Sequence, residues 1–235
     1  MAPTILIVGA TGNTGRSVVE TLSDSINNNK TLAGYRIIAL TRNSDSLTAQ
    51  KLGKLSNVTI EEKNWVDISP EWLKERNVVK AFPNVFTSFV LGPALEFIKQ
   101  YCKDGKQNML LLMLDGNTPL GCIHSDEVGR FAAILLAQED HSIHNKKKYE
   151  LNGPMDINGK QIVKLIEEHI RTEVKDFKFR DMSFVDAWAD SVKANKSLIL
   201  FIKGAPNTDW EGKCSTATTS KEFLELSPPK ITPAM

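Results

Sequence analysis

The stretch TILIVGATGNTGRSVVETL, residues 4–22, predicts the fold of this chain. It begins with an unbroken apolar run, Ile5–Val8, which is typical of a strand buried on both faces of a parallel sheet. Three glycines follow the run: Gly9, Gly12 and Gly15. After them, apolar residues recur at helical spacing. The stretch therefore predicts a strand, a glycine turn and a helix.

This order of elements predicts a phosphate site. Backbone N–H groups face outward at a helix N-terminus, and the helix dipole favours a negative charge there. Gly9 permits a tight turn, Gly12 lets a pyrophosphate approach the backbone, and Gly15 lets helix and strand pack closely. The spacing is GxxGxxG rather than the general GxGxxG, and a glycine turn that only packs is the alternative. The residues expected to bind the coenzyme here are Gly9, Thr11, Gly12, Asn13, Thr14 and Gly15.

The end of the second predicted strand, Arg36–Leu40, bears on the choice of coenzyme. A dehydrogenase that prefers NAD carries an acidic residue there for the ribose hydroxyls, whereas this chain reads Thr41, Arg42, Asn43. A guanidinium suits a 2′-phosphate, which an acid would repel. Arg42 therefore predicts NADP(H), and a solvated surface charge is the alternative interpretation.

The chain continues with further predicted elements of an α/β fold. We expect a third strand over Val58–Glu61 and a fourth over Asn77–Phe82, with a helix beginning at Ser69 and Pro70 between them. Trp65 lies just after the third strand. It is expected either beside an adenine or in the core.

Less regular patterns follow the fourth strand. Short strands are expected over Met109–Leu114, Cys122–His124 and Lys148–Leu151. Helices are expected from Ser125 and, through a capping box of Asn158 and Gln161, from residue 158 onward. Two polar stretches predict irregular chain: a loop over Ser23–Lys30, and, from Thr208, a loop, one short helix and a loose tail.

Composition excludes several classes of function. The 235 residues are 41% hydrophobic and 24% charged, with a formal net charge of +1, so no charge-driven nucleic-acid or membrane role is indicated. No apolar run is long enough to span a membrane. The three cysteines are scattered and expected to be reduced, no metal-ligand spacing exists, and we expect a cytoplasmic protein.

Several segments, taken in order, resemble the NmrA-like family of atypical short-chain dehydrogenase/reductases, which are related to isoflavone reductases. They are VGATGNTGRSVVETL, IIALTRN, PNVFTSFVLGP, IHSDEVGRFAAILL and YELNGP. The resemblance implies a Rossmann-type parallel sheet with helices on both faces and a small C-terminal α+β region. It also implies that Gly9–Gly15 hold the pyrophosphate of NADP(H), that Arg42 holds its 2′-phosphate, and that the loop around Trp65 flanks the adenine.

The chain departs from the family where Phe82 directly precedes Pro83. Relatives carry several dozen residues there, and two parallel neighbours need a crossover of about a dozen residues or more. We therefore expect an internal deletion and a truncated sheet. No Tyr-x-x-x-Lys motif occurs to supply a proton, so the catalytic residues are unknown. Lys80 is a candidate by location alone.

These observations predict an NADP(H)-binding domain over residues 1–150, incomplete after residue 82, and a substrate or partner region over 151–235. The favoured function is an NADPH-dependent oxidoreductase of small organic substrates. Two alternatives stay open. One is a non-catalytic dinucleotide sensor that binds a regulatory protein, and the other is an inactive shortened form of a reductase.

Overall fold

The computed structural model describes residues 3–28, 32–64, 67–75, 78–82, 91–138, 140, 142–144, 147, 149–191, 196, 200, 202–204 and 206–232. The chain forms two compact units, each built from three segments. Unit 1 comprises Met1–Phe86, His124–Leu151 and Ser220–Pro229, and unit 2 comprises Thr87–Ile123, Asn152–Thr219 and Lys230–Met235. The units thus interleave along the chain, whereas the sequence suggested one boundary after residue 150. Which residues form a nucleotide domain and which a substrate region stays a prediction.

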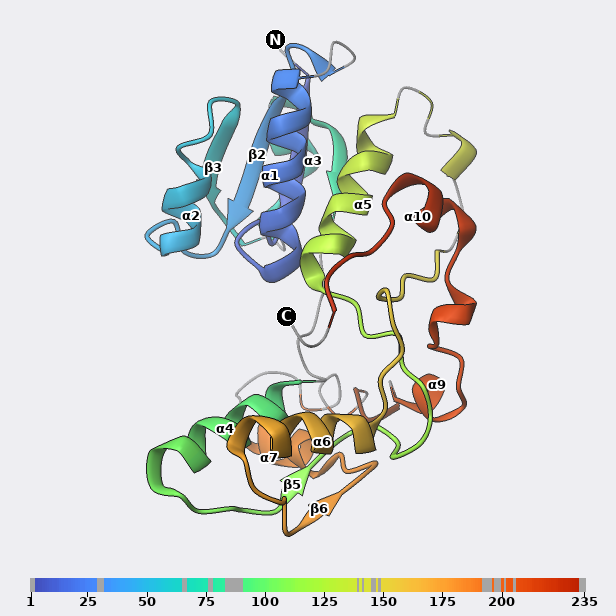
Figure 1. Cartoon of the computed structure of the whole chain (residues 1–235). Helices are drawn as coiled ribbons and strands as arrows, with labels where there is room; N and C mark the ends of the chain where they lie inside the picture. The colour runs from blue at the N-terminus through green and yellow to red at the C-terminus, as the bar shows by residue number, and fades with distance from the viewer. Residues whose placement is uncertain are drawn as a thin grey trace. The chain divides into compact units, whose positions relative to one another are not determined.

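Unit 1 contains a four-stranded parallel sheet (Figure 1). Its strands are β1 (Thr4–Val8), β2 (Arg36–Thr41), β3 (Val58–Glu62) and β4 (Val78–Phe82). They lie in the order β3-β2-β1-β4, which is the order of the first four strands of a Rossmann sheet. Within the described residues the sheet ends at β4. The predicted α/β fold with a truncated parallel sheet is therefore confirmed.

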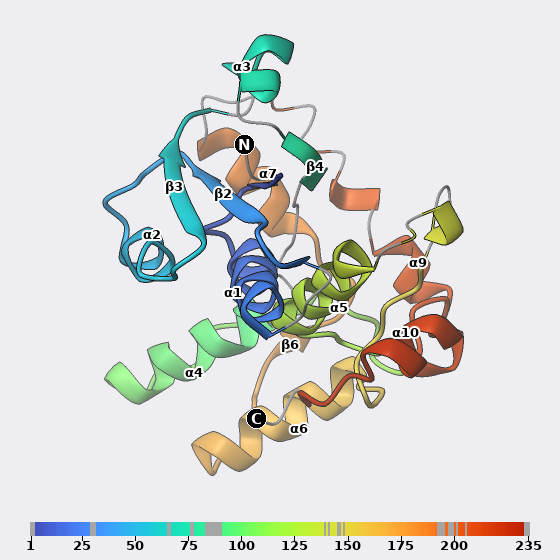
Figure 2. The ribbon, with the colours of Figure 1, turned by 90° about the horizontal axis from the view of Figure 1, so that it is seen from above.

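Helices cover both faces of this sheet (Figure 2). Ile5 and Ile7 of β1 point into a core formed with α1 (Asn13–Asn28) and α5 (Ser125–Ala137). The residue between them, Leu6, points to the other face, where Trp72 of α3 (Pro70–Glu75) packs. Both faces are apolar because alternate strand residues face opposite sides and each side is buried. A further short helix, α2 (Leu47–Leu52), precedes β3.

Helix α1 is longer than the sequence predicted, because Ser23–Asn28 continue it instead of forming a loop. Ser23 is buried, and its hydroxyl donates a 2.7 Å hydrogen bond to Oδ1 of Asn57, whose Nδ2 donates back to the Ser23 carbonyl at 3.2 Å. This exchange with a residue before β3 satisfies polar groups that would otherwise favour a turn.

The C-terminal segment contains a short helix that is anchored in unit 1. Helix α10 (Lys221–Leu226) places Phe223 in the interior of unit 1, where its ring lies edge-on to that of Phe131 at 5.0 Å. Beyond the helix, Arg130 Nε donates to the Ser227 hydroxyl at 3.0 Å. A short helix was expected in the stretch from Thr208, and α10 is such a helix; one fully buried aromatic ring anchors it in an otherwise polar stretch.

Unit 2 combines helices with a two-stranded parallel sheet, β5 (Leu110–Leu111) and β6 (Phe177–Lys178). Among the described residues its helices include α4 (Gly92–Asp104), α6 (Gly159–Ile170), α7 (Ser183–Ser191) and α9 (Asn207–Trp210). Short 3₁₀ turns span Ile202–Gly204 and Thr216–Thr218 in unit 2, and Ser142–His144 in unit 1. Helix α6 begins with the predicted capping box, in which Asn158 and Gln161 exchange two hydrogen bonds of 2.9 Å. Unit 2 thus combines helices and strands, as expected of the C-terminal region, but it also includes Thr87–Ile123.

Three predicted strands differ from the structure. Only Leu110–Leu111 of the stretch 109–114 is strand, and neither residues 122–124 nor the described residues 149–151 form one. Gly121, just before Cys122, is instead bonded to two different segments, since its N–H donates to the Cys214 carbonyl at 2.8 Å and its carbonyl accepts from Gly153 N–H at 2.9 Å. Single hydrogen bonds to separate segments leave no partner strand for a ladder.

Candidate functional site

Strand β1 ends in a tight turn that leads directly into α1. Gly9 has φ of 70°, in the left-handed region that favours glycine. Its carbonyl accepts the Gly12 N–H at 3.0 Å, and the next residue, Ala10, donates to the Leu40 carbonyl of β2 at 3.1 Å. One hydrogen bond thus closes the turn, and another joins it to the neighbouring strand.

Gly15 makes this turn possible. A Cβ atom at Gly15 would lie 2.2 Å from the Gly9 carbonyl oxygen, so no side chain fits without moving the backbone. A Cβ at Gly12 would lie 3.2 Å from the same oxygen, which is tight but tolerable after small shifts. The close helix–strand approach predicted for the third glycine is therefore present. We call residues Gly9–Gly15 the phosphate turn below.

The phosphate turn leaves backbone donors unused. The N–H groups of Asn13, Thr14 and Gly15 have no backbone acceptor among the described residues, and helical bonding along α1 begins with Arg16, which donates to Gly12 at 2.9 Å. Gly9, Gly12 and Asn13 are exposed. The Thr14 hydroxyl is buried and has no hydrogen-bond partner among the described residues. Free N–H groups at a helix N-terminus suit an anion. These free donors fit a coenzyme diphosphate, and Gly15 keeps them in place because a side chain there would push the start of α1 away from Gly9 and Ala10.

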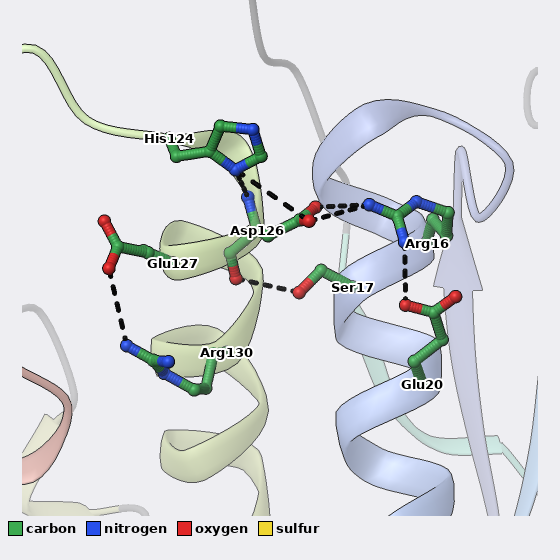
Figure 3. A network of polar contacts seen from close by, with 7 residues as sticks. All are labelled: Arg16, Ser17, Glu20, His124, Asp126, Glu127 and Arg130. Atoms are coloured by element: carbon green, nitrogen blue, oxygen red, sulfur yellow. Dashed lines mark hydrogen bonds and ion pairs between the residues drawn. The ribbon is translucent and has the colours of Figure 1, made fainter. Parts of the chain in front are cut away.

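A polar network fixes the start of α1 against the start of α5 (Figure 3). Arg16 donates to both carboxylate oxygens of Asp126, at 2.6 and 2.8 Å, and to Glu20 at 2.9 Å. Ser17 donates to the Asp126 carbonyl at 2.8 Å. A Cβ at Gly129 of α5 would lie 2.7 Å from that of Ser17, which shows how closely the helices approach. Arg16 thus joins two helices, and its charge is already balanced by two carboxylates.

The end of β2 lies beside the phosphate turn. The hydroxyl oxygens of Thr11 and Thr41 are 3.0 Å apart, which links the turn to the residue before Arg42. Arg42 is exposed, and its side chain has no hydrogen bond or ion pair with any described residue. Lys63, just after β3, donates its backbone N–H to the Thr41 carbonyl at 2.9 Å. Two cationic residues therefore follow neighbouring strands at this edge of the sheet.

Two residues singled out from the sequence add nothing further to the site. Trp65 lies outside the described residues. Lys80 is in β4, where its Cα is paired with that of Ile5 of β1.

In the described part of the chain, no three His, Cys, Asp or Glu side chains are grouped as a metal ion would require, and no helix is sufficiently long and apolar to cross a membrane.

Unit 2 contains a buried acid that sequence reasoning missed. Asp209 of α9 is 6% exposed, and neither carboxylate oxygen has a hydrogen-bond partner among the described residues. Burial, together with the charge of Asp115, raises the pKa of Asp209 to about 6. Asp115 itself accepts from Arg180 Nε at 2.6 Å, and the Arg180 guanidinium lies 5.4 Å from the Trp210 ring centre. Asp209 stands out only after folding, because the residues around it come from distant segments.

The comparisons with known proteins bear on the family and on the fold. Residues 1–107 match the NmrA-like family, and the resemblance expected from the sequence is confirmed for that part of the chain. No curated protein matches the chain in sequence.

Solved structures resemble the fold over nearly its whole length. NADPH-dependent quinone oxidoreductase from Escherichia coli has a TM-score of 0.64 at 16% identity, over 98% of this chain and 97% of that chain. The same enzyme complexed with NADPH has a TM-score of 0.60 at 16% identity, over 98% and 97% of the two chains. A UDP-glucuronic acid 4-epimerase variant from Bacillus cereus, in complex with NAD, has a TM-score of 0.51 at 11% identity, over 89% and 98%. Likeness at this level of identity establishes the fold.

Proposed function

We propose that this protein binds NADP(H) through the phosphate turn and Arg42, and that it is an oxidoreductase of small organic substrates. The observation that carries the proposal is the row of unused N–H groups at Asn13, Thr14 and Gly15, in a turn where Gly15 admits no side chain. The fold shared with an NADPH-dependent quinone oxidoreductase supports it. Quinones are therefore the first substrates to test.

Each part of the site has a defined task in this proposal. The unused N–H groups of the phosphate turn bind the diphosphate, and the dipole of α1 favours its charge. The Arg42 guanidinium binds the 2′-phosphate, which distinguishes the two coenzymes. The coenzyme, when bound, supplies the hydride. No residue is assigned as the proton donor.

Calorimetric titration with NADP⁺ and with NAD⁺ tests the coenzyme part of the proposal. Arg42→Ala should weaken NADP⁺ binding by about 1.5–3 kcal/mol, which is on the order of tenfold to a hundredfold. Binding of NAD⁺ should hardly change. Arg36→Ala is the matched control, because Arg36 is an exposed arginine at the opposite end of the same strand. Equal losses for both coenzymes, or an equal effect of Arg36→Ala, would remove the reason for naming NADP(H).

A non-catalytic dinucleotide sensor is the second candidate, and the state of Tyr149 favours it. The sequence has no Tyr-x-x-x-Lys motif. The Tyr149 hydroxyl lies 2.5 Å from Nδ1 of His144, whose Nε2 lies 2.6 Å from the Gln138 side-chain oxygen. This tyrosine is therefore held in a local chain of hydrogen bonds at the far end of α5 from the phosphate turn.

NADPH oxidation with a panel of quinones and other carbonyl compounds separates the candidates. Steady oxidation that requires both NADPH and a quinone supports the oxidoreductase. Tight NADP⁺ binding without turnover, together with a protein partner recovered only when NADP⁺ is present, supports the sensor. Folded protein that neither binds a coenzyme nor turns over is the expected result for an inactive shortened form.

A further inference from the structure

The loop that follows β2 uses its backbone donors internally. Asn43 N–H donates to the Thr41 hydroxyl at 3.2 Å, and Asp45 N–H donates to the Asn43 side-chain oxygen at 2.9 Å. Between them, Ser44 N–H donates to Oε2 of Glu62 at 2.8 Å. Three consecutive N–H groups next to Arg42 are thus occupied. This contrasts with the phosphate turn, where three consecutive N–H groups are unused.

Glu62 takes more than one donor from this loop. The Ser44 hydroxyl also donates to Glu62 Oε2, at 2.5 Å. Glu62 is the last residue of β3, and its Cα is paired with that of Thr41, so the sheet itself places this carboxylate next to the loop. The hydrogen bonds from Ser44 lower the pKa of Glu62, so the side chain is charged at neutral pH.

A carboxylate that holds two donors resembles a bound anion. The 2′-phosphate of NADP(H) carries a charge of about −1.5 to −2 and would approach the same loop through Arg42. The Glu62 carboxylate already occupies the Ser44 donors that could otherwise bind this phosphate, and it has a charge of the same sign. Like charges repel over this range, and the repulsion is weakened by solvent and salt.

We propose that Glu62 is a specificity-determining residue: its carboxylate competes with the coenzyme 2′-phosphate for Ser44 and lowers the preference of this site for phosphorylated over unphosphorylated coenzyme. The proposal rests on the proposed function and adds the group that opposes Arg42. Two charges of opposite sign, from the ends of neighbouring strands, therefore set the balance between NADP(H) and NAD(H).

Glu62→Gln separates charge from position. Glutamine has the same size and retains an oxygen that accepts from Ser44, but it has no charge. Glu62→Ala frees both donors of Ser44. Glu61→Gln is the matched control, because it removes the same charge from the preceding residue, which alternates to the other side of the strand. None of these changes fills space in the phosphate turn.

Adenosine 2′,5′-bisphosphate and adenosine 5′-monophosphate are the probes, because they differ only in the 2′-phosphate. Glu62→Gln should bind the bisphosphate about three- to tenfold more tightly than the wild type does. Glu62→Ala should shift the affinity in the same direction. The monophosphate should bind all variants equally, and Glu61→Gln should match the wild type. The gain should shrink as salt is raised.

Unchanged or weaker binding of the bisphosphate by Glu62→Gln would overturn the inference, as would equal changes for both probes, which indicate a role in holding the loop. Calorimetry with the coenzymes separates this failure from that of the proposed function. If the wild type binds NADP⁺ and Glu62→Gln brings no gain, only the inference fails. If neither the wild type nor any variant binds NADP⁺ or NAD⁺, both fail.

Discussion

The phosphate turn of unit 1 and the Asp209 carboxylate of unit 2 both have polar groups without partners among the described residues, but of opposite kinds. In the turn these groups are N–H donors in a stretch whose Gly9, Gly12 and Asn13 are exposed. In unit 2 they are the two acceptor oxygens of a carboxylate that is 6% exposed.

The difference shows how the surroundings decide what an unpaired group can do. N–H donors at a helix N-terminus that opens beside exposed residues bind an anion when it arrives. A buried carboxylate without partners is destabilised in its charged form, so it takes up a proton more readily. The turn is therefore a preformed binding site, whereas Asp209 makes the stability of unit 2 sensitive to pH.

The largest expected effect follows from placing a side chain at Gly15. Gly15→Ala places a Cβ 2.2 Å from the Gly9 carbonyl oxygen, so the backbone must move. We expect a loss of about 2–4 kcal/mol in the free energy of unfolding and loss of measurable NADP⁺ binding. Chemical denaturation and calorimetry measure the two effects.

Two other glycines in unit 1 provide comparisons for this change. Gly53→Ala puts a Cβ 3.3 Å from a movable Ile60 side-chain atom. It should leave the free energy of unfolding and NADP⁺ binding nearly unchanged. Gly12→Ala should keep the fold and weaken only coenzyme binding. Native-like NADP⁺ binding by Gly15→Ala would contradict the described geometry of the turn.

The next effect concerns Asp209. Its pKa of about 6 lies above the ordinary 3.8, so proton binding stabilises the folded state fully below about pH 4, and this contribution is lost as pH rises through about 6. Asn is neutral at every pH. Asp209→Asn should therefore be more stable than the wild type by about 1–3 kcal/mol near pH 8, and should show no gain near pH 4.

Denaturation of both proteins across this pH range checks the prediction. Asp176→Asn is a suitable control, because Asp176 is an exposed acid of the same unit. Asp176→Asn should not raise the free energy of unfolding near pH 4 or near pH 8. Equal stabilisation by Asp209→Asn at low and high pH would mean that the ionisation of Asp209 is not the cause.

The smallest effect tests whether Arg16 belongs to the site or to the scaffold. The Arg16 and Asp126 side chains are 37% and 33% exposed, so a double-mutant cycle of Arg16→Ala and Asp126→Asn should give a coupling of about 0.5–1 kcal/mol. Arg16→Ala should leave NADP⁺ binding within about twofold, since its charge is already balanced. A loss as large as that of Arg42→Ala would place Arg16 on the phosphate.

The parts of the structure that could be predicted from the sequence are those encoded locally. The spacing of Gly9, Gly12 and Gly15 reports a backbone conformation, and the apolar run before it reports a buried strand. Asn158 and Gln161 likewise form their capping box within one helical turn. In each case the residues that make the interaction lie within a few positions of one another.

The parts that were missed depend on residues far apart in the sequence. Arg16 and Asp126 are 110 positions apart, and the sequence around one residue does not indicate that the other is its partner. Phe223 lies in a polar stretch and is buried in the fold, where its ring meets that of Phe131. Ser44 and Glu62 look like ordinary surface residues until the pairing of β2 with β3 places them together. Such contacts follow from tertiary packing, which local pattern does not report.

The central claim is that the unused N–H groups of the phosphate turn bind the coenzyme diphosphate. It is tested most directly by following the backbone amide resonances of ¹⁵N-labelled protein during titration with NADP⁺. The account predicts large, saturable shifts for the amides of Asn13, Thr14 and Gly15, with the same dissociation constant as calorimetry gives. Saturable binding of NADP⁺ that leaves these three amides unmoved would contradict it.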